Sequence, residues 1–215
     1  MSDDVMEQLP GLPARAFEKA DTSPDTAFYR QPRYVAHIDD GAIAAVTSVY
    51  REVLPAGGAV LDLMSSWISH FPDDVAYVAT GHGMNAAELR ANTRLSRTFV
   101  QNLNADAVLP LGNGAFDAAA MCVSVQYLQQ PVTVFREVRR VLRAGAPFVV
   151  SFSNRCFPTK AVAIWQALSG PEQQELVAAY MERAGFVRIE GRAHTPRGSD
   201  PLWVVIGRAG ALAQA

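Results

Sequence analysis

Segments with the apolar spacing of a helix alternate along this chain with short apolar runs that are typical of strands. Ile43, Val46, Tyr50, Val53 and Leu54 recur at helical spacing after an acidic pair that can cap a helix. The apolar run 59–63 then predicts a buried strand. Further strands are predicted within residues 73–83, 97–106, 109–125, 147–153, 185–191 and 200–209. Further helices are predicted within residues 84–92, 131–145, 160–168 and 171–184.

This order of elements predicts the fold class. Strand and helix alternate until the last two strands, which have no helix between them and can only form a hairpin. We therefore expect an α/β fold with a doubly wound, mostly parallel, seven-stranded sheet and a terminal antiparallel strand. Residues 39–215 form the predicted domain, and residues 1–38 form an N-terminal arm and lid segment whose first 25 residues lack periodicity and predict a loose arm.

Composition narrows the setting of the protein. The chain has 215 residues, 49% of them hydrophobic, and a formal net charge of -2. Neither a basic stripe nor an apolar run of about 20 residues occurs, so we expect neither nucleic acid nor a membrane as partner. The start of the chain does not resemble a secretory signal. Cys122 and Cys156 lack metal-site spacing, so we predict no metal and a reducing, cytoplasmic location.

Four motifs occur in order along residues 40–210. They are VLDLMSSW, LPLGNGAFDAA, SVQYLQQPVTVFREVRRVLRAGAPFVVSF and LVAAYMERAGFVRIE. As an ordered set they resemble the class I S-adenosylmethionine-dependent methyltransferases, of the kind called methyltransferase type 11. The stretches SSWISHFP, GMNAAEL, NLN and SFSNRCF further resemble a bacterial and plastid branch with an S-S-W-x-S-H-x-P first loop. Asn102 departs from that branch, in which an Asp is usual.

The resemblance implies a Rossmann-like methyltransferase fold and S-adenosyl-L-methionine as cofactor. In such sheets, ligands lie outside the carboxyl ends of the strands. The positions that match the cofactor site of the family are Asp62, Met64, Ser65, Ser66, Gly83, Met84, Asn85, Leu103, Asn104 and Ser124.

Two of these strand ends differ from the family pattern. The first loop lacks the usual glycines, and we expect Ser65 and Ser66, near a helix start, to hold the methionine carboxylate with their hydroxyl and N–H groups. The alternative is an ordinary turn of small polar residues. At the second strand end Gly83 stands where the ribose-binding acid is usual, and no carboxylate is available. Asn85 either contacts the ribose or simply caps the next helix.

The reaction site is predicted at the fourth and fifth strand ends and under the lid. The candidate catalytic residues are His70, Tyr127, Arg155 and Cys156. Arg155 could keep an anionic nucleophile ionised, whereas the alternative for Tyr127 and Cys156 is plain packing. The candidate substrate-binding residues are Tyr29, Arg33, His37, Trp67 and Asn154. Aromatic rings among them would attract a sulfonium through cation–π interaction. The alternative for His37 and His70 is that they are hydrogen-bonded residues with a purely structural role.

The resulting prediction is methyl transfer to a small-molecule acceptor by a monomer or homodimer. No paired carboxylates are evident, which favours a small thiol or sulfide as acceptor, because a thiol ionises easily near a cation. The alternative is a non-catalytic, methyltransferase-like binding or scaffold protein, which the missing glycines and ribose acid favour. A nicotinamide-dependent reductase would require G-x-G-x-x-G after the first strand, and the sequence lacks it.

Overall fold

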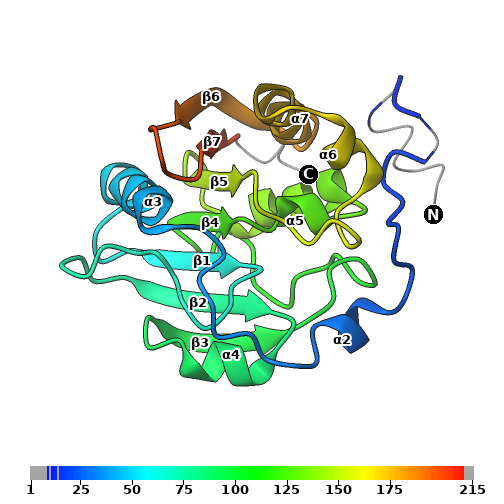
Figure 1. The fold of residues 1–215 in the computed structure, drawn as a ribbon. Helices are drawn as coiled ribbons and strands as arrows, with labels where there is room; N and C mark the ends of the chain where they lie inside the picture. The colour runs from blue at the N-terminus through cyan, green and yellow to red at the C-terminus, as the bar shows by residue number, and fades with distance from the viewer. Residues whose placement is uncertain (1–8, 10, 14, 211–215) are drawn as a thin grey trace.

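The computed structural model describes residues 9, 11–13 and 15–210 of the chain (Figure 1). A seven-stranded sheet with the order β3-β2-β1-β4-β5-β7-β6 forms its centre. The strands are β1 (Ala59–Leu63), β2 (Val78–Gly83), β3 (Leu95–Val100), β4 (Ala118–Cys122), β5 (Pro147–Ser153), β6 (Phe186–His194) and β7 (Leu202–Ala209). The helices are α2 (Asp25–Phe28), α3 (Asp40–Val53), α4 (Ala86–Ala91), α5 (Pro131–Val141), α6 (Ala163–Ala167) and α7 (Gly170–Arg183).

The strand pairing confirms the predicted fold class. β3, β2, β1, β4 and β5 pair in parallel, and β7 runs antiparallel between β5 and β6. The last two strands thus form the expected hairpin, and β4 and β5 lie in the middle of the sheet. Every residue of β5 is buried, including Ser151 and Ser153.

Two apolar clusters, one on each face of the sheet, hold the layers together. Residues of β1 alternate between them, with Val60 on one side and Leu61 and Leu63 on the other. The Val60 side packs against α3, whose first turn is capped by the Asp39 carboxylate accepting from the Ala42 N–H group. The opposite side packs against α5 and α7. The fold therefore has three layers, with helices on both faces of the sheet (Figure 1).

The connection from β1 to β2 differs from the prediction. Residues 64–77 contain no helix, so the helix start expected at Ser65 and Ser66 does not exist. The sequence there, MSSWISHFPDDVAY, offers no helical apolar stripe and contains Pro72, which disfavours a continuous helix. The first loop therefore has no helix N-terminus with which to bind an anion.

The N-terminal segment runs along the carboxyl ends of the strands before it enters α3 (Figure 1). Its described part is not the loose arm that the sequence predicts. Lys19 forms an isolated β-bridge with Val162, and the Ala163 and Ile164 N–H groups donate to the carbonyls of Glu18 and Ala16. The segment is therefore attached to the loop that follows β5.

A buried lysine fixes the next turn of this segment. The Lys160 side chain is fully buried, and its Nζ donates to the Ser23 carbonyl at 2.6 Å and lies 3.2 Å from the Asp21 carboxylate. It also lies 3.6 Å from the Asp25 carboxylate, which pairs with Lys19 at 2.7 Å. Removing one member of such a cluster leaves uncompensated buried charge.

Within the described residues, none of the helices combines the length and the apolar character that crossing a membrane requires.

Lys160→Met should lower the free energy of unfolding by about 2 kcal/mol, because it leaves the Ser23 carbonyl and the Asp21 carboxylate without the buried cation that binds them, while Asp25 keeps its pair with Lys19. It should also speed proteolytic cleavage within residues 15–38. Urea denaturation and limited proteolysis would measure these effects. Arg51→Ala is the matched control: it removes an ion pair with Asp74 that is exposed to solvent, so its cost should be below about 1 kcal/mol. Equal costs for the two variants would contradict the structural role of Lys160.

Candidate functional site

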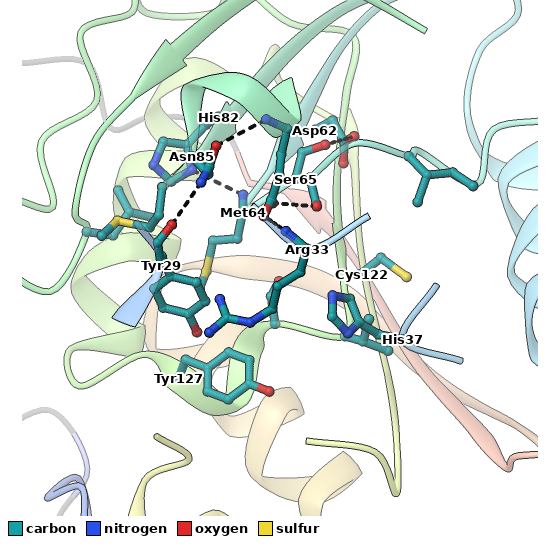
Figure 2. A pocket seen from close by; sticks show the side chains of 18 of the residues that line it. Tyr29, Arg33, His37, Asp62, Met64, Ser65, His82, Asn85, Cys122 and Tyr127 are labelled. Carbon is teal, nitrogen blue, oxygen red and sulfur yellow. Dashed lines mark hydrogen bonds between the residues drawn. The ribbon is translucent and has the colours of Figure 1, made fainter. Parts of the chain in front are cut away.

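A cavity of about 360 Å³ lies at the carboxyl ends of β1, β2, β3 and β4, beneath the N-terminal segment (Figure 2). This is the expected position for a ligand in an open α/β sheet, and the volume is within the range for small-molecule sites. The predicted site residues line this cavity, with two exceptions. Trp67 and Asn154 lie outside it.

The first loop satisfies its own polar groups. The Met64 N–H group donates to His82 Nδ1 at 3.1 Å, and the Ser65 N–H group donates to the His82 carbonyl at 2.6 Å. The Ser65 hydroxyl donates to Asp62 at 2.6 Å, and the Ser66 hydroxyl donates to Glu88 at 2.6 Å. The Ser65 N–H group and both serine hydroxyls were expected to hold a carboxylate of the cofactor, and each of these three donors already has a partner within the protein.

The backbone of this loop is tightly constrained. Met64 adopts φ 55°, a left-handed conformation in which glycine is ordinarily favoured. A Cβ added to Gly83 would lie 2.5 Å from the Ser65 carbonyl oxygen. Glycine is therefore required at the end of β2, because the first loop crosses over it in close contact.

His82 supports the crossing as a neutral imidazole. It is almost fully buried, and burial lowers its pKa to about 4. Since Nδ1 accepts from Met64, Nε2 carries the proton and donates to the Gln101 carbonyl at 3.0 Å. The ring thus joins the first loop to the end of β3, a role the sequence analysis did not identify.

Asp62 at the end of β1 is a buried carboxyl group that lines the cavity. Burial raises its pKa to about 6, and hydrogen bonds from the Ser65 and Ser69 hydroxyls oppose that rise. The carboxyl group is therefore mostly ionised at pH 7 and protonated in mild acid. It can accept a hydrogen bond from a cationic ligand group.

Asn85 and Asn104 connect the strand ends to the N-terminal segment. The Asn85 Oδ1 caps α4, and its Nδ2 donates to the Tyr29 carbonyl at 2.9 Å and to the Arg30 carbonyl at 3.1 Å. The Asn104 Nδ2 donates to Asp25 and to the Tyr127 carbonyl, each at 2.9 Å. The capping alternative for Asn85 is the one observed. Both side-chain amides therefore attach the N-terminal segment to the strand ends that line the cavity.

Glu88 supplies the carboxylate that the sequence analysis did not find near the second strand. It lies in the first turn of α4 and lines the cavity. One oxygen accepts the Arg33 N–H group at 2.7 Å, and the other accepts the Ser66 hydroxyl. Its position three residues after the cap Asn85 was the available signal, because that position places a side chain beside the start of the helix.

The end of β4 combines backbone strain with a partnerless hydroxyl. Val123 adopts φ 43°, which is unusual for a β-branched residue and occurs mostly at functional positions. The Ser124 Oγ is buried and has no hydrogen-bond partner among the described residues. The Tyr127 hydroxyl accepts the Phe157 N–H group at 2.9 Å, and burial raises the pKa of Tyr127 to about 12. Tyr127 is therefore neutral.

Arg155, in the loop after β5, was predicted to keep an anionic nucleophile ionised, and the contacts of this loop do not favour that role. The Arg155 Nε donates to Asp200 at 2.9 Å, so its charge is paired outside the cavity. Cys156 is half-buried, and burial raises the pKa of its thiol. Asn154 is exposed. Among the described residues, burial alone acts on the pKa of the Cys156 thiol and no cation favours its ionised form, which supports the packing alternative.

His37 and His70 both line the cavity as neutral rings at pH 7. Burial lowers the pKa of each, and the nearby His37 lowers that of His70 further. A neutral imidazole can accept a proton. Trp67 instead donates its indole N–H to the Val35 carbonyl at 3.0 Å and contacts Tyr34, which anchors the N-terminal segment from outside.

Comparison with known proteins agrees with this geometry. Residues 56–150 match a family described as a methyltransferase domain, which spans β1 to β5. No curated protein matches the chain.

Solved structures share the whole fold. A possible histamine N-methyltransferase from Thermotoga maritima is 16% identical with a TM-score of 0.59, covering 79% of this chain and 89% of that one. A methyltransferase from Mesorhizobium loti is 17% identical with a TM-score of 0.54, covering 79% and 99%. The [4+2]-cyclase SpnF is 16% identical with a TM-score of 0.62, covering 87% and 91%. The fold is therefore that of the class I S-adenosylmethionine-dependent methyltransferases.

Asp62→Asn should change how stability depends on pH. The folded pKa of Asp62 is raised to about 6, so the native state binds more protons than the unfolded state between about pH 4 and pH 6. Wild-type stability therefore falls as pH rises through this window. The variant, whose amide keeps an acceptor for Ser65 and Ser69, should gain about 3 kcal/mol relative to wild type between pH 4 and pH 7. Urea denaturation at several pH values would measure this; parallel curves would contradict it.

Proposed function

We propose that this protein transfers the methyl group of S-adenosylmethionine to a small-molecule acceptor. The observation that carries the proposal is the cavity at the carboxyl ends of β1 to β4, in the region that matches a methyltransferase domain. Its lining offers a separate environment for each part of the cofactor. Function is argued from that lining, because the fold alone hosts several reactions.

The lining fits the chemistry of the cofactor. Glu88 provides a carboxylate that can accept hydrogen bonds from ribose hydroxyls, and Asp62 provides one for the ammonium group. Leu103 and Met84 provide apolar surface for the adenine ring.

The cofactor supplies a methyl group already activated by its positive sulfur. The residues of the chain have to align the acceptor and exclude water. The N-terminal segment excludes water, since residues 15–38 lie over the strand ends and are attached by Lys160, Asn85 and Asn104. His70, neutral at pH 7, is the proposed general base, and His37 is the alternative.

We further propose a small thiol or sulfide as the acceptor class. A thiol has a lower pKa than an alcohol, so a neutral histidine can accept its proton near pH 7. The cavity needs no metal for this reaction. Arg155 does not help such a thiol to ionise, because its charge is paired with Asp200.

A second candidate function is ligand binding without methyl transfer. The observation that favours it is the first loop, in which the Met64 and Ser65 N–H groups and the Ser65 and Ser66 hydroxyls already have partners within the protein. The [4+2]-cyclase SpnF has a similar fold and is named for another reaction. Cofactor binding and acceptor methylation therefore require separate measurements.

Calorimetric titration with S-adenosylhomocysteine should show micromolar binding to the purified protein. Glu88→Gln should weaken that binding about tenfold, because an amide accepts ribose hydroxyl bonds less strongly than a carboxylate. Asp106→Asn is the matched control: this exposed residue follows β3 and lies outside the cavity lining. No binding up to millimolar ligand would contradict the proposed cofactor, and equal losses in both variants would contradict the role of Glu88.

Labelled S-adenosylmethionine should transfer its methyl group to at least one member of a panel of small thiols. His70→Asn should lower kcat by about 100-fold with that acceptor, because the proton loses its base. His194→Asn, which alters an exposed histidine at the end of β6, should leave kcat unchanged. Cofactor binding without labelling of any thiol or sulfide would rule out this acceptor class and favour the second candidate function.

A further inference from the structure

Arg33 brings an unneutralised positive charge into the cavity. Two arginines occur in the described cavity lining, Arg33 and Arg155. Arg155 pairs with Asp200, whereas no described carboxylate lies within 4.0 Å of the Arg33 guanidinium. One of the Arg33 N–H groups, on Nη2, donates to the Phe28 carbonyl at 3.0 Å. Arg33 therefore retains donors for a ligand.

Aromatic rings hold the Arg33 side chain in place. Its Cζ lies 4.4 Å from the centroid of the Phe28 ring, 5.3 Å from that of Phe157 and 5.9 Å from that of Tyr29. The backbone N–H of Arg33 is fixed separately, by its bond to Glu88. Stacking orients a guanidinium without using its edge donors. The side chain is thus pre-organised before any ligand binds.

The Arg33 side chain points into the cavity (Figure 2). Figure 2 shows Arg33 extending across the cavity, with its guanidinium between the rings of Tyr29 and Tyr127. A ligand bound against the ends of β1 and β4 would meet this guanidinium.

Four donors of the first loop are already engaged within the protein. The Met64 and Ser65 N–H groups donate to His82, and the Ser65 and Ser66 hydroxyls donate to Asp62 and Glu88. Breaking any of these bonds to bind a ligand would leave a buried acceptor unsatisfied. A carboxylate in this cavity therefore finds its free, charged donors at Arg33.

We propose that Arg33 binds the carboxylate of the methionyl group of the cofactor. This assignment rests on the proposed function, because it presumes that S-adenosylmethionine occupies the cavity. The guanidinium forms a charge-assisted pair with the carboxylate, which its planar donors can engage in two parallel bonds. The carboxylate is then held by the N-terminal segment instead of by the loop that follows β1.

Matched ligands test the assignment directly. S-adenosylhomocysteine and its decarboxylated analogue differ only in the carboxylate. Calorimetric titration of wild type should show tighter binding of S-adenosylhomocysteine by at least about tenfold, the effect expected of a hydrogen bond to a charged group. Arg33→Met should weaken S-adenosylhomocysteine by about 10- to 100-fold and the analogue by less than about twofold. Arg33→Lys should fall between wild type and Arg33→Met.

Arg30→Met is the control, since this exposed arginine lies in the same segment and outside the cavity lining. It should leave both affinities unchanged. Binding of the decarboxylated analogue also reports that Arg33→Met is folded.

Each other outcome overturns the assignment. Equal losses for both ligands in Arg33→Met would mean that Arg33 acts through the segment and not on the carboxylate. Unchanged S-adenosylhomocysteine affinity would mean that the carboxylate is held elsewhere, or that Arg33 binds an anionic acceptor. Absence of binding of either ligand to wild type would overturn the proposed function itself, and this assignment with it.

Discussion

The close crossing of the first loop over the end of β2 is the constraint on which the site depends. Ser65 donates its N–H group to the His82 carbonyl, and its own carbonyl occupies the space in which a side chain at position 83 would lie. The crossing turns the hydroxyl of Ser65 toward Asp62 and that of Ser66 toward Glu88. The hydroxyls of Ser65 and Ser66 are thereby engaged in bonds within the protein. We therefore expect other elements to supply contacts to a ligand.

The N-terminal segment supplies several of those contacts. It brings Tyr29, Arg33 and His37 to the cavity, and its attachment uses buried charge at Lys160 and amide bonds from Asn85. Such polar contacts hold the segment in one geometry over the strand ends.

Local sequence patterns predicted the fold well and the site only in part. The strand 59–63 and the helix capped by Asp39 follow from periodicity and capping, which depend on near neighbours. Glu88 escaped prediction because its placement depends on where α4 sits beside the first loop, 22 residues earlier in the chain. The roles of Asn85 and Arg155 likewise depend on partners 55 and 45 residues away, which no local pattern encodes.

A crystal structure of the protein with S-adenosylhomocysteine would show which groups contact each part of the ligand. We expect the hydroxyls of Ser65 and Ser66 to keep their bonds to Asp62 and Glu88, and the ligand carboxylate to lie against Arg33. A ligand carboxylate bound by the Ser65 and Ser66 hydroxyls, with the loop rearranged away from β2, would contradict it.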